Sequence, residues 1–137
     1  MKAIRAFYRY EDEDGHLLAD LAAVRAMVER VRADSVAYDA PLLSLWYIDG
    51  DDDTPEFGVG VHGDVGVLSY TGPGLWSSHN GDLAAGEPII YSYMSNASEF
   101  PACAQIPYAD VLAAAEAFFT SGGDRPGMVV WREEGAG

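Results

Sequence analysis

The sequence has 137 residues, with 22 acidic against 8 basic side chains and a formal net charge of −14. A chain of this length buries about two-thirds of its unfolded surface, so it needs no metal or disulfide to fold, and its one cysteine, Cys103, excludes an intramolecular disulfide. The charge disfavours nucleic acid and anionic membranes as partners, because phosphate binding requires lysine and arginine. It favours a basic protein surface, although charge that only keeps the protein soluble is an equally simple explanation.

The N-terminal residues predict a strand and then an amphipathic helix. Residues Lys2–Tyr10 alternate between two faces, and Asp14 stands where a helix N-cap is expected. A helix is expected over about His16–Ala33, because apolar residues recur there with the helical period: Leu17, Leu21, Val24, Val28 and Val31. The arginines among the first nine residues, with no continuous apolar segment after them, argue against a signal peptide.

The middle of the chain predicts consecutive strands joined by short turns. Leu42–Ile48 is nearly free of polar residues and reads as a central strand, and an acidic turn follows at Asp49–Pro55. Two alternating segments, Phe57–Val61 and Val65–Tyr70, flank a turn at His62-Gly63-Asp64 and predict a hairpin. Glycines within these strands indicate places where a helix or an aromatic side chain crosses closely.

The last third predicts a loop, a strand, a helix and a final strand. The loop spans residues 72–82 and carries Trp76; the elements after it are Pro88–Met94, Pro107–Ser121 and Met128–Arg132. Trp46 and Trp131 fall in predicted strands and are expected in the core. The order β-α-β-β-β-β-α-β predicts an α+β fold, a mainly antiparallel sheet with two helices packed on one face. A single domain is expected over residues 1–132, with a flexible tail over 133–137.

No motif in the sequence predicts catalysis, a cofactor or a metal. Asp49, Asp51 and Asp53 begin like an EF-hand loop, but Thr54 stands where the loop needs glycine and Gly60 where it needs glutamate. Neither a nucleophile elbow nor a zinc, phosphate or dinucleotide motif is present in the sequence. The alternative to a binding protein is a small-ligand or enzymatic site in a pocket near His79, Tyr91 and Glu99.

Acidic and aromatic residues are the candidates for partner binding. The acidic turn concentrates carboxylates that can dock on a basic partner, or that simply form a solvated hairpin tip. Exposed aromatic side chains beside such carboxylates make good interface anchors, whereas strand tyrosines are also common on half-buried faces. The candidate partner-binding residues are Asp49, Asp51, Asp52, Asp53, Glu56, Trp76, Tyr91, Tyr93 and Glu99.

The C-terminal third resembles the Imm1 family of immunity proteins. The resemblance spans about Glu87 to Trp131 and begins with a tyrosine-rich strand. The segments that follow in order are Ser98-Glu99-Phe100-Pro101, Ile106-Pro107, an alanine-rich helix ending in Phe118-Phe119, Gly122-Gly123, Pro126 and Val129-Val130-Trp131. Proteins of this family accompany polymorphic toxins in bacteria, often toxins with deaminase domains. The resemblance therefore implies a non-enzymatic, cytoplasmic inhibitor that binds a cognate toxin.

Overall fold

The computed structural model describes residues 2–9, 13–82, 86–93 and 96–133. Its strands form one sheet in the order β10-β6-β5-β4-β3-β1-β2. Three further strands lie off this order: β7 pairs with β3 and with β8, and the short β9 pairs with β5. All pairings are antiparallel except one, the single parallel pair Leu42↔Ser92 between β3 and β7. The prediction of an α+β fold with a mainly antiparallel sheet is confirmed.

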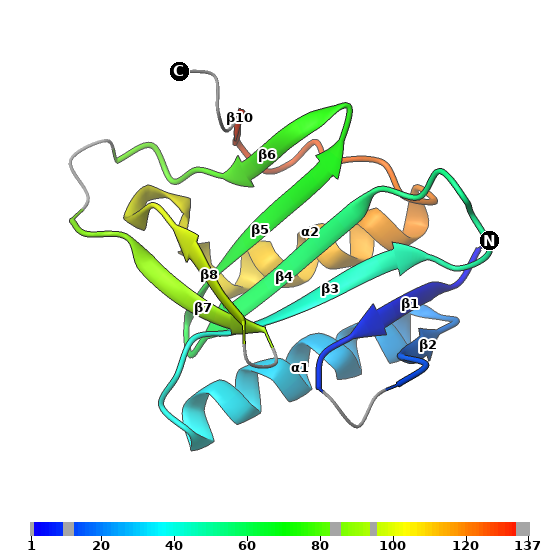
Figure 1. Cartoon of the computed structure of the whole chain (residues 1–137), viewed down its shortest axis with the longest axis horizontal. Coiled ribbons are helices and arrows are strands. Elements are labelled where there is room, and N and C mark those ends of the chain that lie inside the picture. Colours follow the sequence, from blue (N-terminus) through cyan, green and yellow to red (C-terminus); the bar gives the residue numbers. More distant parts are fainter. Residues whose placement is uncertain (1, 10–12, 83–85, 94–95, 134–137) are drawn as a thin grey trace.

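The elements have these bounds in chain order. The strands are β1 (Ile4–Phe7), β2 (His16–Leu18), β3 (Leu42–Ile48), β4 (Glu56–His62), β5 (Val65–Gly72), β6 (Gly74–Ser78), β7 (Ile89–Tyr93), β8 (Asn96–Phe100), β9 (Ile106–Pro107) and β10 (Trp131–Glu133). The helices are α1 (Leu21–Ala37) and α2 (Tyr108–Thr120), and a 3-10 turn covers Ala102–Ala104. In Figure 1 the hairpin β7–β8 crosses in front of the sheet, whereas α2 lies behind β4 and β5.

The first helix begins later than the sequence predicts. Gly15, with a φ of +72°, turns the chain, and His16–Leu18 then pairs with β1 as a strand. Asp20, not Asp14, caps α1, because its carboxylate accepts a hydrogen bond from the Ala23 amide at 2.8 Å. Leu17 is therefore 52% exposed on the edge strand β2, and its assignment to the buried helical stripe was wrong.

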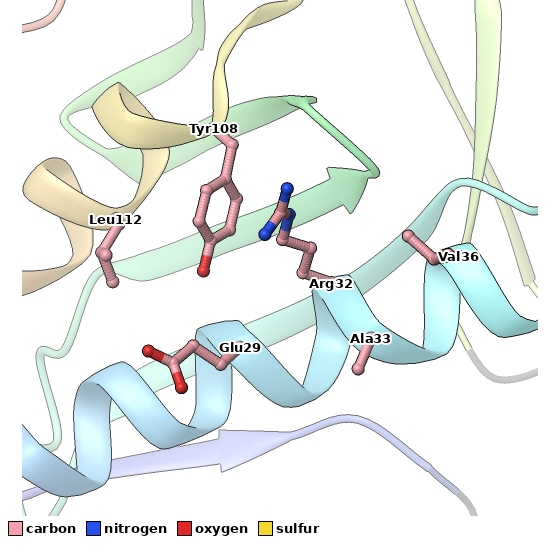
Figure 2. Close-up of a pocket in the computed structure, with 6 residues that line it drawn as sticks. All are labelled: Glu29, Arg32, Ala33, Val36, Tyr108 and Leu112. Carbon is pink, nitrogen blue, oxygen red and sulfur yellow. The ribbon is translucent and has the colours of Figure 1, made fainter.

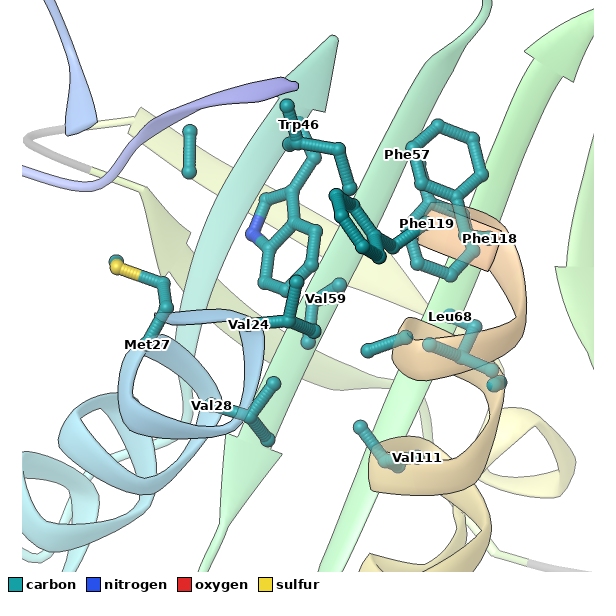
Figure 3. Packing of buried hydrophobic residues seen from close by; sticks show 14 of the residues in the cluster. Val24, Met27, Val28, Trp46, Phe57, Val59, Leu68, Val111, Phe118 and Phe119 are labelled. Atoms are coloured by element: carbon teal, nitrogen blue, oxygen red, sulfur yellow. The ribbon is translucent and has the colours of Figure 1, made fainter. Parts of the chain in front are cut away.

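Both helices cover the same face of the sheet and build the main core with it. Phe57 of β4 stacks on Phe118 of α2 with ring centroids 4.3 Å apart, and Trp46 meets Phe57 edge-on at 6.1 Å. The indole of Trp46 donates to the Ser44 hydroxyl at 2.9 Å, which in turn donates to the Val59 carbonyl at 3.0 Å. Figure 3 shows this packing of α1 and α2 against side chains of the strands. The expectation that Trp46 lies in the core is confirmed, since its exposure is 0%.

The opposite face of the sheet is covered only in part, by the β7–β8 hairpin. Tyr91 is fully buried there, in a second cluster with Leu43, Val67 and Phe100. A Cβ at Gly60 would come within 2.8 Å of the Tyr91 ring, and one at Gly66 within 2.9 Å of Val111 on α2. The predicted role of the strand glycines is confirmed: one makes room for an aromatic ring and the other for a helix.

Besides β2, three strands do not appear among the predicted elements. The Gly72-Pro73-Gly74 segment, expected to open a long loop, is instead the tight turn between β5 and β6. Asn96–Phe100 forms β8 although it lacks the β-branched residues that mark most strands. The two-residue strand β9 is below the length at which alternation can be read.

The C-terminal elements also differ from the prediction. The last strand begins at Trp131 rather than Met128, and Met128 and Val130 are both exposed. Trp131 is half-buried against the main core rather than enclosed in it. Glu133, expected in the tail, pairs with Trp76 in the sheet. The rest of the predicted tail (134–137), like Tyr10 and Met94 at the ends of two predicted strands, lies outside the described residues.

Candidate partner-binding surface

A groove opens on the sheet face opposite the helices because one row of side chains across the strands is small. Leu45 of β3, Gly58 of β4 and Ser69 of β5 are direct cross-strand neighbours and therefore share that face. Gly58 has no side chain, and the Ser69 hydroxyl occupies the space that a Cβ at Gly58 would fill. Leu45 and Ser69 of this row line the groove and form its floor.

The two walls of the groove come from separate parts of the chain. One wall is the β7–β8 hairpin, which sits on the row formed by Leu43, Gly60 and Val67. The other wall is the row that contains Glu56, Thr71 and Leu75. The groove between them has a volume of about 320 Å³, and six polar residues line it: Glu56, Ser69, Thr71, Tyr93, Ser98 and Glu99.

Carboxylates and hydroxyls give the groove an electronegative character. Glu56 accepts a hydrogen bond from the Tyr47 phenol at 2.8 Å, which fixes the carboxylate in place. Burial and this neighbouring carboxylate both raise the pKa of Tyr47 above its ordinary value, so the phenol stays protonated and keeps donating. No basic side chain lines this groove in the described part of the chain. Its chemistry is suited to a cation and unsuited to a phosphate.

The predicted acidic turn connects β3 and β4 and is partly neutralised within the protein. The Arg5 guanidinium on β1 bonds to Asp49 at 2.8 Å, and the Lys2 ammonium lies 3.8 Å from Asp51. The Asp51 carboxylate also accepts from the Asp53 amide at 2.9 Å, while Asp52 and Asp53 are exposed. The turn is thus an ordered loop with its free charge concentrated at its tip.

Trp76 lies on the helix side of the sheet, away from the groove. Its ring contacts the main core, its indole donates to the Pro73 carbonyl at 3.1 Å, and the Arg125 guanidinium covers it at 4.0 Å. Its neighbour Leu75 points to the opposite face, lines the groove and is 44% exposed. The prediction that Trp76 is exposed in the middle of a loop is therefore wrong. Its ring is half-buried, and the residue belongs to β6.

The remaining candidates separate into buried and accessible residues. Tyr91 has an exposure of 0% and its hydroxyl donates to Gln105 at 3.0 Å, so its ring supports the hairpin rather than offering contact area. Tyr93 and Glu99 both line the groove. The structure thus brings together Glu56, Tyr93 and Glu99 and leaves Tyr91 beneath them.

The residues of the alternative small-ligand site do not share any of the pockets found among the described residues. His79 lines a different pocket of about 220 Å³, with Asn80, Asp110 and Val130, whereas Glu99 lines the groove. The His79 ring nitrogen accepts from the Gly81 amide at 2.8 Å and shapes a local turn. Residues that do not converge on one cavity cannot act together on one ligand.

A third hollow lies between the two helices. Glu29, Arg32 and Val36 of α1 face Tyr108 and Leu112 of α2 across it, as Figure 2 shows. The Arg32 guanidinium stacks on the Tyr108 ring at 4.5 Å and bonds to Asp64 at 2.7 Å. This hollow of about 610 Å³ carries both charge signs, and its arginine already has partners in the protein.

The described residues contain neither a metal-ligand cluster nor a membrane-spanning helix. No group of three or more His, Cys, Asp or Glu side chains within residues 2–9, 13–82, 86–93 and 96–133 is placed to hold a metal ion. Neither helix in these ranges is long and apolar enough to cross a membrane.

Sequence patterns alone did not reveal the groove, since its residues come from six strands, β3 to β8. The available signal was the alternation of Gly58 and Gly60 with large residues in β4, which leaves two positions on one face of that strand without a side chain. Tyr47 was also missed as the residue that holds Glu56.

An α+β domain with an acidic, open groove and no convergent catalytic cluster among its described residues has the features of a protein-binding domain. The model of the family "Immunity protein Imm1" matches residues 12–133 of the 137-residue chain, so this protein belongs to the Imm1 family of immunity proteins. The resemblance noted for the C-terminal third is confirmed and extends over nearly the whole chain. Membership implies that the protein binds a cognate toxin, and it suggests a non-enzymatic inhibitor. None of the curated proteins matches the sequence.

Proposed function

We propose that this immunity protein neutralises a nucleic-acid-targeting toxin, a deaminase or a nuclease, in the cytoplasm by binding its basic substrate-binding surface. Enzymes that act on nucleic acid carry basic grooves for phosphate. An acidic protein can occupy such a groove by placing carboxylates where phosphates would lie. The observation that carries the proposal is the groove lined by Glu56 and Glu99 without a basic side chain, in a chain of net charge −14.

The acidic loop has a separate role in this proposal. Exposed charges at Asp52 and Asp53, with Asp49 and Asp51 behind them, attract a basic toxin over a distance and speed its association. Fast association matters for an immunity protein, because an unbound toxin molecule continues to do damage. The loop therefore steers the toxin, while Tyr93 and Glu99 in the groove contact it.

The test is co-expression of the protein with the toxin domain encoded by the adjacent gene. We expect a stable one-to-one complex in pull-down and complete loss of deaminase or nuclease activity only when the inhibitor equals the toxin in amount. Inhibition far below equimolar amounts would instead indicate catalysis. A bound toxin whose activity is on cell-wall or protein substrates would contradict the nucleic-acid part of the proposal.

The Trp76→Ala variant tests the proposed aromatic anchor. If the toxin displaces Arg125 and contacts the ring, the variant dissociates faster while its association rate is unchanged. A variant that loses thermal stability but binds as the wild type does would show that Trp76 serves only the fold.

A further inference from the structure

We propose that the sheet groove receives an arginine- or lysine-bearing segment of the toxin, whose cation pairs with Glu56 and Glu99 while its methylene stem packs on the groove floor. This inference rests on the proposed function and adds to it the site and the chemistry of the contact. It concerns the one sheet face that the fold leaves partly uncovered.

The groove offers matching surfaces for both parts of such a side chain. Its apolar lining includes Leu45 on the floor and Leu43 at the base of the hairpin wall, and Leu75 stands exposed on the other wall. Lysine and arginine side chains bury their stems on apolar surface and keep the charged head at polar groups. The Tyr93 ring adds an aromatic surface on which a guanidinium can stack.

The acceptor at Glu56 is ordered before the partner arrives. Its carboxylate is half-buried and held by Tyr47, whose ring in turn packs edge-on against Phe7 at 5.8 Å. A positioned carboxylate loses little side-chain freedom when it pairs, so more of the interaction energy contributes to affinity. Glu99 lies opposite Ile90 on the outward side of the hairpin, and both are exposed, so Glu99 forms the rim.

Other charged parts of the surface fit a basic segment less well. Arg5 and Lys2 already neutralise part of the acidic loop. The hollow between the helices presents Arg32 beside Glu29 and would repel a cation as well as attract it. Among the three pockets described, the groove alone combines carboxylates, an apolar floor and a lining without basic residues.

The first experiment neutralises the groove without changing its shape. The variant Glu56→Gln/Glu99→Gln keeps an acceptor oxygen for Tyr47 and removes two charges. We expect it to bind the toxin domain at least tenfold more weakly than the wild type, chiefly through faster dissociation. The control Glu13→Gln/Glu29→Gln removes the same charge from exposed sites away from the groove and should bind within about twofold of the wild type.

The second experiment closes the groove sterically. Thr71 is exposed on the wall, and Thr71→Trp places an indole over the opening at a strand position that tolerates aromatics. The control is Thr120→Trp, at the exposed end of α2. Equal binding of Thr71→Trp and Thr120→Trp, with both variants folded by circular dichroism, would overturn the inference.

A probe independent of the toxin separates this inference from the proposed function. Titration of the isotope-labelled protein with arginine amide at low salt should shift the amide resonances of Thr71, Tyr93 and Glu99 most. Resonance shifts confined to the acidic loop would contradict binding of the cation in the groove. If the wild type does not bind the toxin domain but arginine amide still binds in the groove, the proposed function fails and the site remains.

Discussion

The two faces of the sheet show how one strand can serve both stability and recognition. In β4 the residues Phe57, Val59 and Val61 point to the helices, whereas Gly58 and Gly60 point to the opposite face. The helix face is filled by large side chains in close contact. The opposite face is thin at Gly58, where only the small Ser69 hydroxyl takes the place of a side chain, and the groove lies over this row. Stability and partner contact are thus assigned to alternate residues of the same strand, and substitutions can separate them.

The largest loss of stability is expected from a substitution on the face of the sheet that the helices cover. Phe118→Ala removes the ring stacked on Phe57 and should lower the free energy of unfolding by about 3–5 kcal/mol, because a cavity replaces a fully buried side chain. Chemical denaturation measures the loss. At temperatures where the variant is folded, its affinity for the toxin should equal that of the wild type. A loss of affinity for the toxin in the folded variant would contradict the assignment of stability and partner contact to different faces of the sheet.

A smaller loss is expected at the edge of the same core. Trp131 is half-buried, donates to the Pro126 carbonyl at 2.8 Å and meets Tyr70 edge-on at 6.4 Å. Trp131→Ala should therefore cost about 2–3 kcal/mol, less than a fully enclosed ring. The midpoint of denaturation reports it, with Trp131→Phe as the conservative comparison. Unchanged stability with lost toxin binding would make Trp131 an interface residue.

An intermediate loss of stability is expected where the β7–β8 hairpin packs on the sheet. Gly60→Ala brings a methyl group within 2.8 Å of the Tyr91 ring and of Val67, and overpacking should cost about 1–2 kcal/mol. Because the hairpin is one wall of the groove, this variant should also weaken toxin binding. The double variant Gly60→Ala/Tyr91→Leu should recover part of the stability. Equal stability of the wild type and Gly60→Ala would show that the hairpin moves aside freely.

The smallest effect on stability is expected in the acidic loop. Changing Asp51, Asp52 and Asp53 together to asparagine should alter the free energy of unfolding by less than about 0.5 kcal/mol, because the loop is largely exposed. Stopped-flow measurements should show slower association at low salt and a flatter salt dependence, with dissociation unchanged. An association rate equal to that of the wild type would leave the loop as a solvated hairpin tip.

Sequence patterns predicted the parts of the fold that depend on regular periods. The central strand Leu42–Ile48 and the helical stripe ending in Phe118 and Phe119 follow from local alternation and spacing. β2 and β9 are too short for such patterns, and β8 is too polar. The strand β8 forms because it pairs with β7, and not because its own residues favour a strand.

The candidate site was predictable only in its chemistry. The acidic charge and the tyrosines indicated a basic protein partner, but the convergence of Glu56, Tyr93 and Glu99 depends on strand register across the sheet. The same register places Trp76 and Leu75 on opposite faces, which a loop assignment could not foresee. Most of the family-like segments serve the scaffold: Phe100 is buried, and the Gly123 carbonyl accepts from the buried Tyr70 hydroxyl at 2.8 Å. Glu99, the charged residue of the Ser98-Glu99-Phe100-Pro101 segment, is exposed.

The alternation in β4 also bears on how the chain avoids misfolding. A shift of β4 by one residue against β5 would turn Phe57, Val59 and Val61 outward and leave two glycines facing the helices. A misaligned β4 would contribute almost no apolar surface to the core, so the free energy of the shifted pairing would lie well above that of the native one. The order of small and large residues along β4 therefore selects the native strand alignment over the shifted one.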